Sequence, residues 1–244
     1  MNTEQIAELL RPFLGAAGLP AEAELSPVQL NYISIYVDLL ERWNTHVNLT
    51  AVRDPETVVT RHFGESLFLA AYLFPHPPHP GETPGEVSFQ QHAVDLGSGA
   101  GFPGLPLKIY APELRLTLVE SNRRKAAFLG EVIRTLGLSG SSVFSGRLDE
   151  RLITKGSSSK PLGIEPVNLV TMRAVEHFEA ALETAAALVR SSGAERGSQR
   201  LALLIGMRQA EQVPRLAPDF SWDPTLLVPQ SRERVLLVGG YPSR

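Results

Sequence analysis

A glycine-rich loop, set between an apolar strand and a helix, is the feature that most constrains how this chain folds. In the segment VDLGSGAGFPG, residues 94–104, a predicted strand closes on Asp95 and a helix is predicted to begin at Pro103. The glycines of this loop are Gly97, Gly99, Gly101 and Gly104. Glycine tolerates positive φ angles and lets a backbone approach a ligand closely, and the following helix offers free N–H groups. The segment therefore predicts a ligand-binding turn at the carboxyl edge of a parallel sheet.

Short apolar runs alternate with helical segments from about His92 onward. The candidate strands are residues 92–96, 115–119, 142–145, 167–171, 200–205, 225–229 and 235–238. The candidate helices are residues 103–110, 123–136, 148–153, 176–190 and 209–213. Such alternation predicts an α/β fold with a mostly parallel, seven-stranded sheet and helices on both faces. No helix is predicted between the last two strands, so we expect them to form an antiparallel pair at the sheet edge.

The first part of the chain is predicted to be helical. Apolar residues recur at helical spacing in residues 6–13 and 27–43, and Ser26 followed by Pro27 is typical of a helix start. A third helix is predicted from Pro55 to about residue 73. The stretch PHPPHPGETPGE, residues 75–86, excludes both helix and strand. We therefore predict a helical extension over 1–74, a proline-rich loop over 75–91 and the main α/β domain over 92–244, with a further polar loop at 155–166.

The composition excludes several kinds of site and mechanism. The chain has no cysteine, which excludes disulfides, thiolate metal ligands and cysteine nucleophiles. Its six histidines show no metal-ligand spacing, so no metal site is predicted. MNTEQIAELL does not resemble a secretory signal and no apolar run could span a bilayer, so we expect a cytoplasmic protein without membrane contact. Because the formal net charge is −3, any RNA contact has to come from a local basic patch.

An acidic residue at the end of the next strand indicates what the glycine loop binds. Glu120 closes the strand in LTLVES, where doubly wound folds place a carboxylate that hydrogen-bonds ribose hydroxyls. The last three glycines of the loop also spell the dinucleotide fingerprint GxGxxG, so NAD is an alternative ligand. Asp95 would crowd a pyrophosphate but suits the cationic amino-acid end of S-adenosylmethionine. Pro103 and Pro106 remove donors that a pyrophosphate-binding helix needs. Asp95 and the two prolines therefore favour S-adenosylmethionine over NAD as the ligand of the loop.

Motifs along nearly the whole chain resemble one family of enzymes. They are DLGSGAGFPGLPLKI (95–109), LTLVES (116–121), RRKAAFLGEV (123–132), VTMRAV (170–175), WNTHVNLTAV (43–52) and RHFGESL (61–67). With these motifs the chain resembles the bacterial small-subunit ribosomal RNA guanine-N7 methyltransferases, called RsmG or glucose-inhibited division protein B. The resemblance implies a class I S-adenosylmethionine-dependent methyltransferase with a Rossmann-like domain and an N-terminal helical extension. It also implies methylation of guanine N7 in the decoding-region loop of 16S rRNA.

The resemblance assigns roles position by position. Gly97 and Phe102 would line the donor pocket, the pair Leu148-Asp149 would flank the adenine, and Arg173 would sit at the active-site mouth. Two positions depart from the family, which usually has Glu where Asp149 stands and Asp where Glu65 stands. The full set of predicted cofactor-binding residues is Asp95, Gly97, Gly99, Phe102, Glu120, Leu148, Asp149 and Arg173.

The predicted chemistry needs alignment of the reactants and no general base. Guanine N7 carries an in-plane lone pair, so attack on the sulfonium methyl requires no prior loss of a proton. Arg173 is the predicted positioning residue, because it leaves the fourth strand at the carboxyl edge of the sheet. The place after that strand reads NLVTMRAVEHF and lacks the Asn/Asp-Pro-Pro-aromatic segment usual in enzymes that methylate exocyclic amino groups. A ring-nitrogen acceptor is therefore favoured.

The expected RNA contacts come from two short segments. Candidate RNA-facing residues are Asn48, Arg61 and His62 in the helical extension, and Arg123, Arg124 and Lys125 after the second strand. The low net charge offers little non-specific RNA affinity, which favours a 30S subunit or assembly particle over naked 16S rRNA as the substrate. Two other functions stay open on the residues alone: a methyltransferase with a different acceptor, and a non-catalytic nucleotide-binding module.

Overall fold

A computed structural model describes residues 1–16, 19, 23–75, 91–148, 166–191 and 199–242 of the chain. The helices are α1 (Thr3–Leu14), α2 (Pro27–Asn44), α3 (Pro55–Val58), the π-helical η1 (Val59–Gly64), α4 (Glu65–Leu73), α5 (Gly104–Tyr110), α6 (Arg123–Leu136), α8 (Phe178–Ser191), α9 (Met207–Ala210) and α10 (Val213–Leu216). The strands are β1 (Gln91–Leu96), β2 (Leu114–Glu120), β3 (Ser141–Ser145), β4 (Leu169–Arg173), β5 (Arg200–Gly206), β6 (Ser221–Trp222), β7 (Leu226–Leu227) and β8 (Arg234–Gly240).

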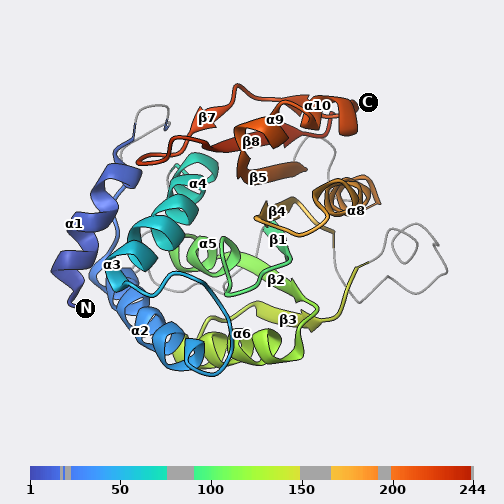
Figure 1. The fold of residues 1–244 in the computed structure, drawn as a ribbon. Coiled ribbons are helices and arrows are strands. Elements are labelled where there is room, and N and C mark those ends of the chain that lie inside the picture. The colour runs from blue at the N-terminus through green and yellow to red at the C-terminus, as the bar shows by residue number, and fades with distance from the viewer. Residues whose placement is uncertain (17–18, 20–22, 76–90, 149–165, 192–198, 243–244) are drawn as a thin grey trace.

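A single sheet organises the molecule, with the strand order β3-β2-β1-β4-β5-β8-β6 (Figure 1). Strands β3, β2, β1, β4 and β5 are all parallel, and β8 then pairs antiparallel with β5. The two-residue strands β6 and β7 also pair antiparallel with β8. The chain order reverses between β1 and β4, and ligands of such sheets bind outside the carboxyl ends of strands at this point.

Helices cover both faces of the sheet, and each face has its own apolar core. On one face α8, α9 and α10 pack against residues such as Val94, Val170 and Leu203. On the other face α5 and α6 pack together with the N-terminal helices against residues such as Leu116 and Ala202. Figure 1 shows this division, with α8, α9 and α10 away from the N-terminal helices. The observed α/β architecture, a mostly parallel sheet with helices on both faces, confirms the predicted fold class, but the described sheet has eight strands where the sequence predicts seven, because the two-residue β6 is not expected from the sequence.

The N-terminal helices share a core with the α/β part of the chain. Helix α2 starts with the predicted Ser26-Pro27 cap, and Gln29 completes a capping box with Ser26. The amide of Gln29 donates to the carbonyls of Ile109 and Tyr110 at 2.9 and 3.1 Å, so it also satisfies the open C-terminal end of α5. These bonds and a common core join α2 to α5.

The chain's two tryptophans lie in different parts of this architecture. Trp43, near the end of α2, packs on Phe128 of α6 with ring centroids 5.6 Å apart. Trp222 of β6 packs on Phe220 with centroids 5.7 Å apart, and its ring lies where a side chain on Gly239 would otherwise stand. Trp43 therefore belongs to the core under the glycine loop, as its helical spacing predicts, and Trp222 belongs to the core on the opposite face.

The predicted third helix is present but changes its winding. Residues 55–73 are helical throughout, as α3, the π-helical η1 and α4. A π-helical segment is rare and is frequent at functional sites. Gly64 ends this segment, and a Cβ there would lie 2.6 Å from the ring of Phe13, so only glycine allows α1 to pack this closely. The change in winding and the glycine together orient the side chains of residues 61–65.

The strand predictions are confirmed within about two residues at each end, except for the next-to-last strand, which is reduced to the short β7. The predicted antiparallel pairing of the last two strands is confirmed as β7 with β8, although β8 also lies between β5 and β6. The prediction of one helix over residues 209–213 is wrong, because two short helices, α9 and α10, lie within residues 207–216. The predicted helix 148–153 and both predicted loops fall mostly or wholly outside the described residues.

No helix in the described part is long and apolar enough to cross a membrane.

Candidate active site

The glycine-rich loop follows β1 and adopts a backbone that only glycine favours. Gly97, Gly99 and Gly101 have φ angles of +69°, +57° and +93°. A Cβ on Gly101 would overlap the hydroxyl oxygen of Tyr36, whose O–H donates to the carbonyl of Ala100. The loop is thus held from behind by a side chain of α2, which leaves its other side for a ligand.

Asp95 lies beneath this loop and is fully buried. Its Oδ1 accepts a hydrogen bond of 2.7 Å from the hydroxyl of Thr171 on β4, and its Oδ2 accepts one of 3.4 Å from the backbone N–H of Gly104. Burial raises the pKa of Asp95 to about 6, although these hydrogen bonds oppose the shift. The carboxylate therefore links the loop, the start of α5 and β4, and its predicted contact with the donor stays a prediction.

Glu120 ends β2 and faces the glycine loop, as the sequence predicts. Its Oε2 accepts 2.8 Å from the backbone N–H of Gly99, and its Oε1 accepts 2.7 Å from the backbone N–H of Asn122. A carboxylate has about four acceptor positions, so two protein bonds leave capacity for further donors. The side chain is pre-oriented by backbone groups and can still accept hydrogen bonds from a ligand.

Phe102 lies inside an aromatic cluster where the loop meets the helical extension. Its ring is parallel to that of Tyr36 (centroids 5.5 Å apart, 1°), meets Phe63 edge-on (5.0 Å, 83°) and stacks with the ring of His62 (5.0 Å, 29°). The guanidinium carbon of Arg173 lies 5.9 Å from the same ring centroid. Because Phe102 is only 7% exposed, it fastens the loop to η1, and its predicted place in the donor pocket stays a prediction.

Arg173, the last residue of β4, is buried within a cluster of charged and polar groups. Its Nη2 lies 2.9 Å from Oε2 of Glu65, and it donates to the carbonyl of Arg61 at 2.9 Å and to Nδ1 of His62 at 3.0 Å. Arg234 of β8 contacts the same Glu65 oxygen through Nε at 3.2 Å. Burial lowers the pKa of Arg173 to about 10, and Glu65 opposes that shift. Its Nε is buried and has no hydrogen-bond partner among the described residues.

His62 is neutral in this cluster, and its tautomer follows from its neighbours. A guanidinium can only donate, so Nδ1 of His62 accepts from Arg173 and the proton resides on Nε2. Nε2 then donates to the hydroxyl of Thr50 at 2.7 Å. Burial, followed by the positive charge of Arg173, lowers the pKa of His62 to about 3. His62 therefore joins Arg173 to the loop before α3 and adds no charge at neutral pH.

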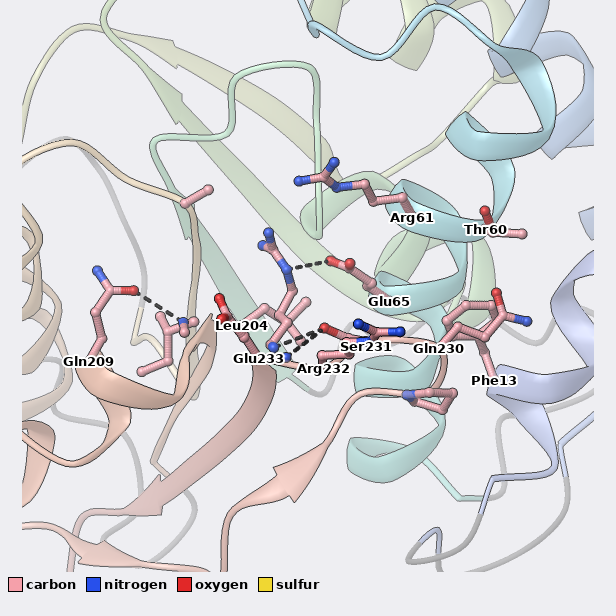
Figure 2. A pocket seen from close by; sticks show the side chains of 15 residues that line it. Phe13, Thr60, Arg61, Glu65, Leu204, Gln209, Gln230, Ser231, Arg232 and Glu233 are labelled. Carbon is pink, nitrogen blue, oxygen red and sulfur yellow. Dashed lines mark hydrogen bonds and ion pairs between the residues drawn. The ribbon is translucent and has the colours of Figure 1, made fainter.

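A cavity of about 590 Å³ opens beside this cluster at the carboxyl ends of β4 and β5 (Figure 2). Its volume lies within the range of small-ligand pockets, about 300–1,000 Å³. The lining comes from α1, η1, α4, the exit of β4, the end of β5, α9, the segment before β8 and the start of β8. Its residues are Phe13, Thr60, Arg61, Glu65, Ala174, Leu204, Ile205, Gly206, Gln209, Pro229, Gln230, Ser231, Arg232, Glu233 and Arg234. Figure 2 shows Arg61 and Glu65 projecting from the same helical segment, with Gln209 on the other side of the opening.

The exit from β4 separates this cavity from the glycine loop. Ala174 lines the cavity, and it has a φ angle of +49°, which is unfavourable for a residue with a Cβ. The next residue, Val175, lies against the loop, since its Cγ1 would be 2.9 Å from a Cβ on Gly97. One short segment therefore contacts both the loop and the cavity, so two ligands bound at these places would meet there.

Of the remaining predicted residues that the structure describes, Arg61 lines the cavity and the others do not. Asn48 and Arg61 are exposed, as are Arg123 and Arg124 in the first turn of α6, while Lys125 is half-buried. Leu148 packs at the edge of the core formed with α8, and Asp149 lies outside the described residues. Sequence reasoning did not assign Arg234 or Thr171 to the site. Thr171 lies within the VTMRAV motif and Arg234 lies in no recognisable motif; strand pairing brings Arg234 to Glu65 and Thr171 to Asp95.

Comparison with known proteins settles which family the chain resembles. A family model described as GidB, rRNA small subunit methyltransferase G, matches residues 29–202. The chain belongs to this family. The rRNA small subunit methyltransferase G family is the one that the glycine loop and the VTMRAV motif predict, so the resemblance is confirmed. Among the described residues no group of three or more His, Asp or Glu side chains could hold a metal ion.

Several curated relatives carry the name ribosomal RNA small subunit methyltransferase G. The relative from Nitrosomonas europaea is 44% identical over 115 residues, which cover 47% of this chain and 47% of the relative. The relative from Roseiflexus sp. is 41% identical over 165 residues, covering 68% of this chain and 62% of the relative. The chain thus spans between about half and two thirds of the length of the relatives it matches.

Solved structures support the fold alone. A mutant of MtNAS is 17% identical, covers 99% of this chain and 86% of its own, and has a TM-score of 0.53. A predicted O-methyltransferase from Agrobacterium tumefaciens is also 17% identical, covers 73% of this chain and 81% of its own, and has a TM-score of 0.51. The similarity to the first includes the N-terminal helices, so the described arrangement of helices and sheet is shared over nearly the whole chain.

Proposed function

We propose that this chain is an S-adenosylmethionine-dependent methyltransferase that modifies N7 of a guanine in the decoding-region loop of 16S rRNA. The observation that carries the proposal is the family match, together with a strand–glycine loop–helix and Glu120 in the arrangement that a nucleoside-containing donor requires. The name of the relatives supports ribosomal RNA of the small subunit as the acceptor.

The residues around the glycine loop fit the proposed donor. Glu120 retains acceptor capacity for ribose hydroxyls, and the absence of a side chain at Gly97 lets Val175 pack against the loop. Leu148 and Asp149 would flank the adenine, and Gly99 would present the backbone of the loop. When bound, the donor supplies an electrophilic methyl group on a sulfonium. Asp95 would add a negative charge under the loop, near the cationic amino-acid end of the donor.

The proposed mechanism is alignment of two bound partners on either side of the β4 exit. The cavity at β4 and β5 would hold the acceptor guanine, and Arg173 would position it by orienting Glu65, which lines the cavity. No side chain has to remove a proton, because N7 attacks with a lone pair. His62, kept neutral by burial, holds the guanidinium of Arg173 in place and leaves the acceptor's protons untouched.

The proposed RNA contacts lie around the rim of this site. Arg61 lines the cavity and is exposed, and Asn48 is exposed on the loop after α2. Arg123, Arg124 and Lys125 occupy the first turn of α6, which contains no acidic residue. Cations are unfavourable at a helix N-terminus, so their presence there supports an external anion such as an RNA phosphate. A folded 30S particle in the cytoplasm is the proposed substrate, and no membrane or metal is part of the proposal.

One experiment tests donor, substrate and acceptor atom together. The protein is incubated with tritiated S-adenosylmethionine and unmodified 30S subunits, and the RNA is then cleaved with borohydride and aniline, which cut at N7-methylguanine. A single cut in the decoding-region loop is expected. Tritium in the RNA without aniline cleavage would contradict N7 as the acceptor atom. Tritium in naked 16S rRNA but not in 30S particles would contradict the particle as the substrate. Absence of label in both RNAs would contradict the proposed function.

A further inference from the structure

Glu65 occupies an unusual position at the first turn of α4. Its side chain is only 6% exposed, yet it lines the cavity beside the β4 exit. One oxygen, Oε2, takes both ion pairs, to Arg173 and to Arg234. Burial raises the pKa of Glu65, and the two guanidinium groups favour its charged form. A buried charge of this kind is costly unless it is paired, so its place on a cavity wall calls for a reason beyond packing.

The pairing of Glu65 leaves it able to accept more hydrogen bonds. A carboxylate has about four acceptor positions, and the two arginines approach the same oxygen. No hydrogen bond joins the other oxygen, Oε1, to any of the described residues, and that oxygen is not among the fully buried atoms. The two ion pairs therefore fix the orientation of the carboxylate and leave Oε1 for a ligand in the cavity.

The chemistry of the four bases decides which ligand suits this carboxylate. Guanine alone presents two adjacent donors, N1–H and the N2 amino group, on the edge away from N7, and a carboxylate accepts from both. Adenine presents a bare ring nitrogen at the corresponding place, which a carboxylate repels. A guanine with N7 turned toward the methyl donor directs this donor edge away from the glycine loop.

We infer that Glu65 is the specificity-determining residue of the acceptor site, where its carboxylate, clamped by Arg173 and Arg234, accepts hydrogen bonds from N1–H and the 2-amino group of the target guanine. The inference rests on the proposed function. The net charge of the cavity lining also fits an RNA nucleotide. The lining has three arginines (Arg61, Arg232, Arg234) and two glutamates (Glu65, Glu233), and the excess of one positive charge suits the phosphate of the nucleotide.

Removal of the 2-amino group from the substrate tests this role directly. Two sets of 30S particles are reconstituted with 16S rRNA that carries either guanosine or inosine at the modified position, since inosine differs from guanosine only by this group. The wild-type chain is expected to prefer guanosine by about ten- to a hundredfold in kcat/KM, the range for a hydrogen bond to a charged acceptor. A wild-type ratio near one would overturn the inference.

Variants separate recognition from structural support. Glu65→Gln is expected to bring the guanosine-to-inosine ratio close to one, whereas a merely structural role would lower both rates and keep the ratio. Glu65→Asp retains the charge and is expected to keep a ratio well above that of Glu65→Gln. Glu233→Gln makes the same chemical change at an exposed position of the cavity and is expected to keep the wild-type ratio. The ratio does not depend on the fraction of folded protein, so a less stable variant still answers the question.

The outcomes distinguish this inference from the proposed function. If guanosine particles are labelled and Glu65→Gln has the same guanosine-to-inosine ratio as the wild type, the role of Glu65 is contradicted and the proposed function stands. A wild-type protein that labels neither kind of particle contradicts both. Binding of S-adenosylmethionine by Glu65→Gln, measured by calorimetry, is expected to be retained, because the two ion pairs of Glu65 go to Arg173 and Arg234 and neither goes to the glycine loop.

Discussion

The two halves of the sheet's carboxyl edge are built in different ways. Around β1 and β2 the polar side chains bind backbone groups of nearby loops: Glu120 accepts from the N–H groups of Gly99 and Asn122, and Asp95 accepts from that of Gly104 as well as from the hydroxyl of Thr171. Around β4 and β5 the polar side chains bind one another, and Glu65, Arg173 and Arg234 come from segments far apart in the chain. We call these the donor half and the acceptor half.

The difference teaches how each half can tolerate change. Backbone N–H groups are supplied by any residue except proline, so the donor half depends on loop conformation more than on side-chain identity. A buried charge network depends on every partner, because removal of one leaves another charge unpaired in a poorly solvated place. The acceptor half is thus expected to be the more fragile, and four changes test that comparison.

The largest effect is expected from Arg173→Met, which leaves Glu65 with one partner and removes the donor to His62. We expect a loss of about 3–5 kcal/mol in the free energy of unfolding, as for other broken buried ion pairs. Glu120→Gln in the donor half is expected to cost only about 1–2 kcal/mol. Urea unfolding measures both, with the exposed Arg61→Met as the control. Equal losses at residues 173 and 120 would remove the distinction between the halves.

The two halves are also expected to respond to acid with opposite signs. The pKa of His62 is about 3 in the fold and near 6.5 when unfolded, so its contribution to stability is lost as the pH falls below 6.5. The pKa of Asp95 is about 6 in the fold and near 3.8 when unfolded, so the folded state gains stability as the pH falls toward 4. Each slope is at most about 1.4 kcal/mol per pH unit.

Unfolding of two variants between pH 6 and pH 4 separates these contributions. Relative to the wild type, His62→Gln is expected to gain about 2–3 kcal/mol over this interval, and Asp95→Asn to lose about as much. His46→Gln changes an exposed histidine and serves as the control. A difference of the same sign for both variants would show that the two halves do not oppose each other.

A third change tests the donor half for shape instead of charge. Gly101→Ala places a Cβ against Tyr36 and Leu105 at a φ of +93°, whereas Gly137→Ala has a φ of +61° and no atom within 4 Å of the new Cβ. Both carry the backbone strain of roughly 1–2 kcal/mol, and only Gly101→Ala adds overpacking, so we expect it to cost about 2 kcal/mol more. Equal thermal stability of the two variants would contradict the close packing of the loop.

The smallest effect is expected outside both halves, at the basic first turn of α6. Arg124→Gln is expected to weaken binding to 30S particles a few-fold and to lower the slope of log K against log salt by about one. Arg134→Gln, at the other end of the same helix and paired with Glu131, is expected to leave that slope unchanged. An unchanged slope for Arg124→Gln would move the RNA contact away from this turn.

The donor half could be predicted from the sequence because its parts are local. The glycine loop lies within eleven residues, and Glu120 follows at the end of the next strand, so the parallel register that aligns β1 with β2 is enough to bring them together. The helix caps at Ser26 and Asn122 are similarly local. Short-range patterns carry the necessary information in each case.

The acceptor half could not be predicted in the same way. Arg234 precedes an ordinary apolar strand, and it reaches Glu65 only because β8 inserts antiparallel beside β5. The side chain of Glu65 points to the cavity after a change to π-helical winding that no residue pattern announces. Charged residues on helices and strand ends are common, so only the packed structure shows which of them lie together.

The separate placement of the two tryptophans has a practical consequence. Trp43 contacts Phe128, which lies beside Tyr36, the residue that holds the glycine loop. Trp222 lies in the core on the opposite face, where it packs on Phe220. Indole emission shifts with the polarity and rigidity of its surroundings, so a chain with Trp222→Phe reports optically on the loop and one with Trp43→Phe on the opposite layer. The protein thus carries two native fluorophores that can follow, without any added dye, whether its layers respond to a ligand or to denaturant together or in sequence.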